Sequence, residues 1–284
     1  MRLVELGPGR GTLMADALRA VRVAKEFRAA LAVDLVEISP ALRRRQQQTL
    51  ADCQVPLSWR AALAEVPEDA PQIVIANEFF DALPVHQAVR AADGWHERMV
   101  GVGEDDELVL ALHPDPIPNF SAMLPKSLSA APLGVVFEWR SDASVAELAA
   151  RVMRLGGAAL IIDYGHAESA LGETLQAVGR HSFAEVLKKP GEVDLSAHVD
   201  FAALARAAAR AGARVHGPVT QREFLTELGI ETRAAMLKAA AGARAGEIDA
   251  ALARLTESGP RGMGELFKVV ALVDPKLGAL PGFG

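Results

Sequence analysis

Cysteine is almost absent from this chain of 284 residues, because Cys53 is the only one. A single cysteine excludes an intramolecular disulfide and any metal site built from several cysteines. The seven histidines show no H-E-x-x-H pattern and no other tight ligand spacing, so we predict that no metal is bound.

Long hydrophobic runs and an excess of basic residues are also missing. No apolar stretch reaches the roughly 18 residues that a membrane-spanning helix needs. A strand-like segment starts at residue 2, so we expect no signal or transit peptide. A net charge of −6 removes the usual driving force for nonspecific nucleic-acid binding. We therefore expect a bacterial protein that resides in the cytoplasm, has no membrane span and binds no nucleic acid.

Strand-like and helix-like segments alternate through much of the chain. The strand-like runs are 2–6, 31–38, 55–59, 73–76 and 158–164. Two helix-like segments lie between the first three of these runs. Residues 13–27 have the apolar spacing of a helix, and residues 40–50 open with Pro40 in the first turn after the cap residue Ser39. This alternation predicts an α/β fold of the doubly wound type, with helices on both faces of a mostly parallel sheet.

The alternation is interrupted by residues 85–133, where Asp93-Gly94 marks a β-hairpin. Beyond the interruption we expect a helix at 199–211, a helical stretch at 221–257 and late strands at 213–217 and 266–273. We predict one domain over residues 1–284, with an antiparallel hairpin and loop inserted at about 85–133.

A glycine-rich loop follows the first strand in "VELGPGRGTLM", residues 4–14. Gly7, Gly9 and Gly11 stand where a strand turns into a helix, so backbone amides can face a ligand closely. A dinucleotide fingerprint would need Gly or Ala at position 12, where this chain has Thr12.

Two acidic residues accompany this loop. Glu5 stands two positions before Gly7, where it would repel a pyrophosphate but attract the cationic amino group and sulfonium of S-adenosylmethionine (SAM). Glu37 ends the second strand, where a carboxylate can accept hydrogen bonds from both ribose hydroxyls. The role of Glu37 suits NAD and SAM alike, and plain turn glycines with a helix-start acid remain the alternative.

Polar residues also end the strand at 73–76. Asn77 and Glu78 follow it directly, at the edge where open α/β sheets bind ligands. We assign Asn77 to the cofactor side and Glu78 to the substrate. Asp81 follows two phenylalanines and is a further acidic candidate, or a simple helix cap.

Other candidates come from later segments: Glu138 in "GVVFEWR", Asp163 in "LIIDYG" and His198 in "DLSAHVDF". Glu138 is a possible partner for Glu78, or an ordinary surface carboxylate. His198 is a candidate proton acceptor, or a structural hydrogen-bonding residue.

The segments "VELGPGRGTLMADALRA", "LVEISPALRRRQ", "IVIANEFFDALPVHQ", "DLSAHVDFAALA" and "MGELFKVVAL" together resemble the MidA-like family of SAM-dependent methyltransferases. The resemblance covers essentially the whole chain, and "NEFFDALP" and "DLSAHVDF" are its most specific motifs. It implies a Rossmann-like class I methyltransferase with a seven-stranded, mostly parallel sheet.

The resemblance also implies the activity. Mitochondrial members of the family are complex I assembly factors that methylate an arginine, so it implies SAM as cofactor and a protein arginine, in a complex I subunit or similar protein, as substrate. Catalytic roles would fall to Glu78, Asp81, Glu138 and His198. Family members usually carry a further N-terminal segment, which we expect this chain to lack. A homodimer is a further expectation.

The residues alone are also consistent with two other functions. One is a noncatalytic assembly or scaffold protein with a degenerate SAM pocket. The other is an NAD-linked oxidoreductase, which Glu5 and Thr12 disfavour.

Overall fold

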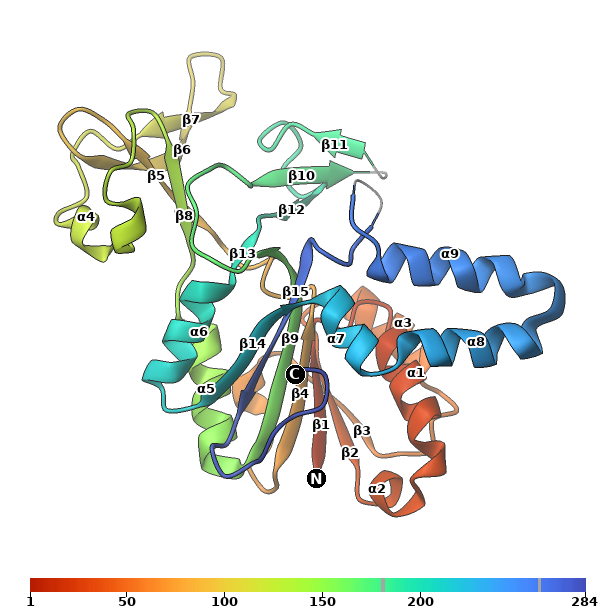
Figure 1. The fold of residues 1–284 in the computed structure, drawn as a ribbon. Helices are drawn as coiled ribbons and strands as arrows, with labels where there is room; N and C mark the ends of the chain where they lie inside the picture. Colours follow the sequence, from red (N-terminus) through yellow and green to blue (C-terminus); the bar gives the residue numbers. More distant parts are fainter. Residues whose placement is uncertain (180–181, 260–261) are drawn as a thin grey trace. The chain divides into compact units, whose positions relative to one another are not determined.

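The computed structural model describes residues 1–179, 182–259 and 262–284, and the chain divides into two compact units (Figure 1). The first unit comprises Met1–Phe80, Ala143–Tyr164 and Leu204–Gly284. The second comprises Asp81–Asp142 and Gly165–Ala203. The organisation as one domain with an insertion stays a prediction.

A central sheet with the strand order β14-β15-β9-β4-β1-β2-β3 forms the first unit (Figure 1). Its strands are β1 (Arg2–Leu6), β2 (Ala32–Val36), β3 (Leu57–Arg60), β4 (Gln72–Asn77), β9 (Gly157–His166), β14 (Arg214–Thr220) and β15 (Phe267–Val273). The neighbours from β9 to β3 pair in parallel, whereas β15 is antiparallel to both β9 and β14. The predicted doubly wound, mostly parallel α/β fold is confirmed.

The register of the central strands brings their carboxyl ends level. Leu6, the last residue of β1, pairs with Val36 of β2 and with Ala76 of β4. Asn77, the last residue of β4, pairs with Ile162 of β9. The segments that follow these strands therefore meet at one edge of the sheet, the edge at which open α/β folds bind ligands.

Burial explains why these segments form strands. Val4, Leu35, Val74 and Ile161 have no exposed surface. These residues belong to strands whose sequences are nearly continuous apolar runs, a pattern typical of parallel strands that are covered on both faces.

Helices connect the strands. Those of the first unit are α1 (Thr12–Ala20), α2 (Lys25–Ala29), α3 (Pro40–Thr49), α5 (Ala143–Leu155), α7 (Gln221–Glu227), α8 (Ile230–Ala241) and α9 (Ala245–Thr256), and α6 (Phe201–Arg210) starts in the second unit. Short 3-10 turns lie at Val21–Val23, Leu63–Glu65 and Gly242–Arg244. The predicted helix 13–27 is wrong as one piece, because Ala24 leaves the helical region at φ −99° and ψ 76°. The helical stretch predicted at 221–257 is confirmed as three helices.

The second unit is built on an antiparallel sheet of order β7-β6-β5-β8. Its strands are β5 (His86–Arg90), β6 (Trp95–Val102), β7 (Leu108–Leu112) and β8 (Val136–Trp139). The hairpin predicted at Asp93-Gly94 joins β5 to β6, and Ala91 N donates to Gly94 O at 2.7 Å. Trp95, Phe120 and Phe137 form an aromatic core beside this sheet.

A smaller sheet completes the second unit. Its strands are β10 (Gln176–Gly179), β11 (Ser182–Ala184) and β12 (Asp194–Ser196), in the order β11-β10-β12. The short β13 (Val199–Asp200) pairs in parallel with Gly165 and His166 at the end of β9. A short helix, α4 (Phe120–Met123), and a 3-10 turn at Lys126–Leu128 lie between β7 and β8.

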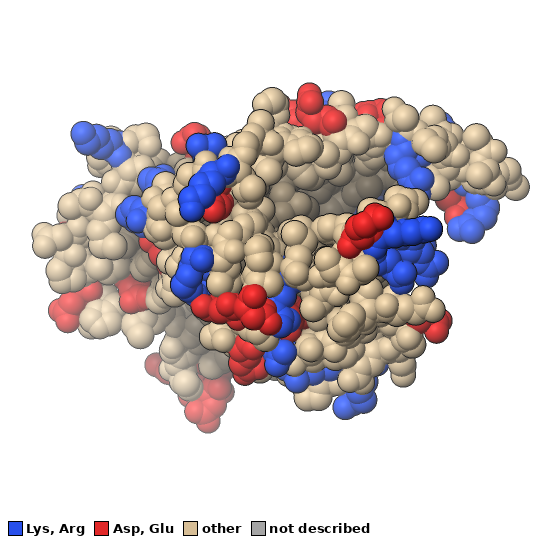
Figure 2. All heavy atoms as spheres, turned by 90° about the horizontal axis from the view of Figure 1, so that it is seen from below, with Lys and Arg blue, Asp and Glu red and all other residues tan. Residues whose placement is uncertain are grey.

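Acidic and basic side chains lie side by side on the face that Figure 2 shows. Within the described part of the chain, no helix combines the length and the apolar character that crossing a membrane requires.

Candidate functional site

The glycine loop connects β1 to α1 through three glycines in the left-handed region. Gly7, Gly9 and Gly11 have φ values of +61°, +51° and +76°, which side chains with a Cβ rarely adopt. A Cβ on Gly7 would lie 3.1 Å from Phe79 Cδ2, whereas a Cβ on Gly9 would meet nothing within 4 Å. Helix α1 has Gly11 as its N-cap and no side-chain cap, so its first amides can serve a ligand.

Glu5 is a buried carboxylate beside this loop. Its side chain is in β1 and 3% exposed, and Oε2 has no hydrogen-bond partner among the described residues. Burial raises the pKa of Glu5 to about 7, because desolvation disfavours the charged form. A buried carboxylate in this state is suited to a cationic or hydrogen-bond-donating ligand.

Glu37 lies one residue beyond β2 and is also buried, with 7% exposure. Its Oε1 accepts a hydrogen bond from Ser39 N at 2.8 Å, and Oε2 accepts one from Gln46 Nε2 at 3.3 Å. A carboxylate has about four lone-pair sites. Glu37 therefore retains capacity for a further donor.

Gln46 connects the two parts of this candidate site, although its sequence position does not predict such a role. It is fully buried on α3, and its Nε2 also donates to Gly9 O at 2.8 Å. Its Oε1 accepts from Trp59 Nε1 at 2.9 Å. The side chain thus ties the glycine loop to Glu37. Its place in the polar run "RRRQQQ" gave no sign of burial.

The turn after β4 carries Asn77 and Glu78. Glu78 is exposed and has a φ of +50°, and its N donates to Ile162 O at 2.9 Å. Asn77 Nδ2 lies 3.5 Å from Glu78 Oε1. Phe80 N donates to Asp163 Oδ2 at 3.0 Å. Because β1 lies between β2 and β4, the structure brings together Glu5, the glycines, Glu37, Asn77 and Glu78 at one sheet edge.

Asp163 belongs to the first unit, whereas Asp81, Glu138 and His198 belong to the second. Arg140 donates to the carbonyl oxygen of Asp81 at 3.0 Å and to that of His198 at 2.7 Å. The ring centroid of His198 lies 6.1 Å from that of His166, at the end of β9, which the sequence analysis did not select. Arg140 thus holds the backbones of two predicted site residues together.

Glu138 is engaged by its own unit. Its Oε1 accepts from Gln87 Nε2 at 2.7 Å, from Thr174 N at 3.1 Å and from Leu175 N at 3.2 Å. Its Oε2 is bonded to Thr174 Oγ1, which in turn accepts from His198 N at 2.9 Å. These contacts give Glu138 an internal role in supporting His198. Its part as a partner of Glu78 stays a prediction.

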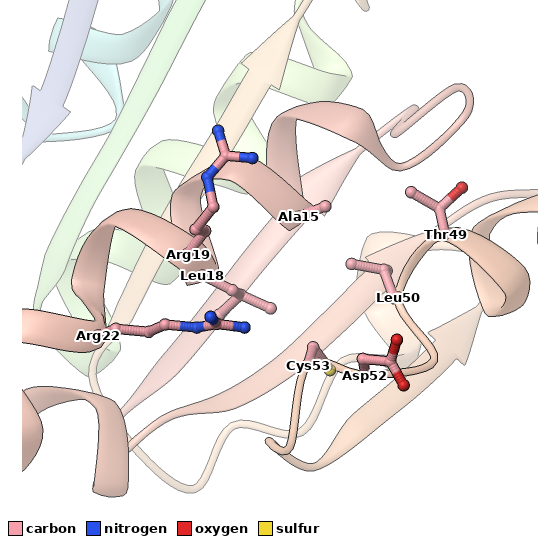
Figure 3. Close-up of a pocket in the computed structure, with 8 residues that line it drawn as sticks. All are labelled: Ala15, Leu18, Arg19, Arg22, Thr49, Leu50, Asp52 and Cys53. Atoms are coloured by element: carbon pink, nitrogen blue, oxygen red, sulfur yellow. The ribbon is translucent and has the colours of Figure 1, made fainter. Parts of the chain in front are cut away.

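A separate pocket of about 150 Å³ lies between α1 and the segment after α3 (Figure 3). It is lined by Ala15, Leu18, Arg19, Arg22, Thr49, Leu50, Asp52 and Cys53. None of these residues is among the predicted site residues. The volume is below the roughly 300–1,000 Å³ of typical small-molecule sites.

Comparison with known proteins identifies relatives of this chain in sequence and in fold. Residues 1–219 match the model of a family described as "Putative S-adenosyl-L-methionine-dependent methyltransferase". The chain is 34% identical over 262 residues to the mitochondrial protein arginine methyltransferase NDUFAF7 of Danio rerio, a match that covers 84% of this chain and 60% of that protein. For the mouse protein of the same name the identity is 36% over 296 residues, covering 96% and 66%. The chain thus spans less than two thirds of the length of these curated relatives.

A solved structure is similar throughout. A superfamily member from Burkholderia thailandensis, bound to S-adenosyl-homocysteine (SAH), matches with a TM-score of 0.85 and 30% identity. The match covers 100% of this chain and 74% of that one.

The relatives correct one expectation. A cytoplasmic location is contradicted by the curated relatives, whose names place them in mitochondria. The expectation rested on a leader sequence that was not found, and such an absence does not determine where a protein resides.

Proposed function

The chain belongs to this family of SAM-dependent methyltransferases, as its resemblance to MidA-like proteins implied, and from that premise we propose that it methylates arginine in a protein substrate. The observation that carries the proposal is the buried carboxylate of Glu5 beside three left-handed glycines, with Glu37 at the end of the adjacent strand. The NAD-linked alternative finds no support among the relatives.

The residues at this sheet edge fit SAM. Glu5 Oε2 is buried with no partner among the described residues, and the ammonium group of SAM would supply one. Open space beside Gly9 lets the backbone approach a ligand closely. Glu37 would accept hydrogen bonds from the ribose hydroxyls, and Asn77 would contribute an amide at the same edge. When bound, SAM supplies a methyl group on a sulfonium that is open to displacement by a nucleophile.

Glu78 is proposed to hold the substrate. It is exposed at the carboxyl end of β4, next to the cofactor residues. A guanidinium is protonated at ordinary pH and is a poor nucleophile until carboxylates orient it and accept its proton. The Glu78 carboxylate would accept hydrogen bonds from the substrate nitrogens and receive the proton that the guanidinium loses. Orientation of the nucleophile is the main contribution such a site makes to methyl transfer.

The remaining parts of the proposal concern partners. The substrate arginine is proposed to lie in a complex I subunit or similar protein, because the MidA-like family that the chain resembles includes complex I assembly factors. Asp81, Glu138 and His198 are proposed as further catalytic residues, and a homodimer remains part of the proposal.

The first prediction concerns Glu78→Gln in cells. Removing the charge should reduce the rate of arginine methylation about 100-fold. Mass spectrometry of methylated peptides should then show loss of a methylarginine in cells that carry the variant. Glu65→Gln is the matched control, because Glu65 is exposed and accepts a bond from Ala61 N away from the site.

Three outcomes separate the possibilities. Loss of the mark in Glu78→Gln but not in Glu65→Gln supports the proposal. An unchanged set of methylated proteins in Glu78→Gln removes Glu78 from the mechanism. If cells that lack the gene also lose no methyl mark, the chain acts as a noncatalytic assembly protein.

A further inference from the structure

Asp163 is a fully buried carboxylate one residue beyond the pairing of β9 with β4. Its Oδ2 accepts a hydrogen bond from Phe80 N at 3.0 Å, and its Oδ1 accepts one from Tyr164 N at 3.0 Å. One side chain therefore holds the backbones of two segments that are 83 residues apart in the chain. Bonds from backbone amides to a carboxylate are charge-assisted and stronger than neutral ones.

The segment that Asp163 holds is the turn Asn77–Phe80. Glu78 adopts a φ of +50° in this turn. A left-handed residue other than glycine costs about 1–3 kcal/mol and persists only where its surroundings hold it in place. Two contacts with β9 hold it. Glu78 N donates to Ile162 O at 2.9 Å, and Phe80 N donates to Asp163. The turn is thus hydrogen-bonded to β9 both at Glu78 and two residues further on, at Phe80.

The same turn reaches the glycine loop. Phe79 lies between Glu78 and Phe80, and its Cδ2 is 3.1 Å from where a Cβ of Gly7 would be. Its ring packs edge-to-face on Phe80, with centroids 5.5 Å apart and planes at 87°. A shift of Phe80 would therefore move the ring that covers Gly7.

We propose that Asp163 is a positioning residue that fixes the Asn77–Phe80 turn, so that Phe79 closes on Gly7 of the cofactor loop and Glu78 faces the substrate. The sequence marked Asp163 only as a candidate acid. Its geometry gives it a different task, because both carboxylate oxygens face backbone amides. The inference rests on the proposed function for its effect on cofactor and substrate, while the effect on the turn stands by itself.

The test compares Asp163→Asn with Asp34→Asn. Asn has the shape of Asp but retains one acceptor oxygen, so an amide of the turn or of Tyr164 would face an NH2 group. Asp34 is also fully buried in the sheet, where it binds Arg2 and Arg60. The control therefore removes a buried carboxylate from the same unit without touching the turn.

Two measurements are made on both variants. Hydrogen exchange followed by mass spectrometry should show faster exchange at residues 78–81 in Asp163→Asn only. Calorimetry should show SAH binding about tenfold weaker in Asp163→Asn and within about twofold of wild type in Asp34→Asn after correction for the unfolded fraction.

A double-mutant cycle with Phe79→Leu separates positioning from general loss of stability. If Asp163 acts through Phe79, Asp163→Asn should weaken SAH binding much less in the Phe79→Leu background than in wild type. If the losses of SAH affinity in Asp163→Asn and Phe79→Leu simply add in the double variant, Asp163 does not act through Phe79. Equal exchange at residues 78–81 in wild type and Asp163→Asn would overturn the positioning role itself.

The outcomes also separate this inference from the proposed function. If wild type does not bind SAH, the cofactor assignment fails, while the exchange data still decide whether Asp163 fixes the turn. If Asp163→Asn does not fold, exchange in wild type decides. A Phe80 amide that exchanges as fast as an open turn would contradict the hydrogen bond on which the inference depends.

Discussion

At the scale of single residues, the site depends on carboxylates that differ in environment. Glu5 is buried beside the glycine loop, and its pKa is raised to about 7 by desolvation. Glu78 is exposed at the next strand end, where it can meet a guanidinium from solvent. Two acids at one sheet edge can serve two cations, which we propose are the ammonium group of SAM at Glu5 and the guanidinium of the substrate at Glu78.

The raised pKa of Glu5 predicts how the protein responds to pH. Since the folded carboxyl binds its proton more tightly than the unfolded one, the unliganded fold should lose about 3 kcal/mol of stability as pH rises from about 4.5 to about 7. A cationic ligand group that pairs with the carboxylate favours the deprotonated form. SAH affinity should therefore rise about tenfold between about pH 6 and pH 8.

Calorimetry at several pH values measures this dependence. Glu5→Gln should bind SAH more weakly at pH 8 and should lose most of the rise, with Glu65→Gln again as the control. A Glu5→Gln variant whose affinity rises with pH as steeply as wild type would show that another group titrates.

At the scale of elements, α3 supports the site through Gln46. Replacing Gln46 by Ala leaves Gly9 O and Trp59 Nε1 without their partner and opens a cavity. We expect a loss of about 2–4 kcal/mol in the free energy of unfolding and SAH binding about tenfold weaker.

Gln47→Ala is a matched control for this prediction. Gln47 is exposed on the same helix, so its replacement should change stability by no more than about 0.5 kcal/mol. Denaturant unfolding and calorimetry of both variants measure the difference. Equal effects of the two substitutions would contradict the role of Gln46.

The elements of the first unit were largely predictable because their patterns are local. Apolar runs marked the strands that became β1, β2, β4, β9 and β15, and Ser39 with Pro40 marked the start of α3. The break at Ala24 was not visible, because helical apolar spacing continues across it. The small sheet β11-β10-β12 was also missed, since its short strands carry many exposed residues.

The candidate site was predictable only in part, for a similar reason. The glycines, Glu5 and Glu37 stand in sequence order around a strand and a helix, so local spacing indicates them. Gln46 and the hydrogen bond between Asp163 and Phe80 depend on segments that are distant in the chain. Tertiary packing decides which polar side chains are buried, and residue type and local spacing do not reveal this.

At the scale of the whole molecule, the two units divide the predicted residues. The cofactor candidates and Glu78 lie in the first unit, and Asp81, Glu138 and His198 lie in the second. Each unit has its own network: Gln46 and Asp163 organise the first, and Arg140 with Thr174 supports the second. We propose that the first unit holds SAM and that its Glu78 holds the substrate arginine.

Transfer of labelled methyl groups tests the central claim most directly. The protein is incubated with SAM that carries a tritiated methyl group and with extract from cells that lack the gene, whose acceptor sites are unmethylated. We predict radioactivity in methylarginine after acid hydrolysis of the proteins, reduced about 100-fold with Glu78→Gln and unchanged with Glu65→Gln. A wild-type protein that binds SAH but places no label in methylarginine would contradict it.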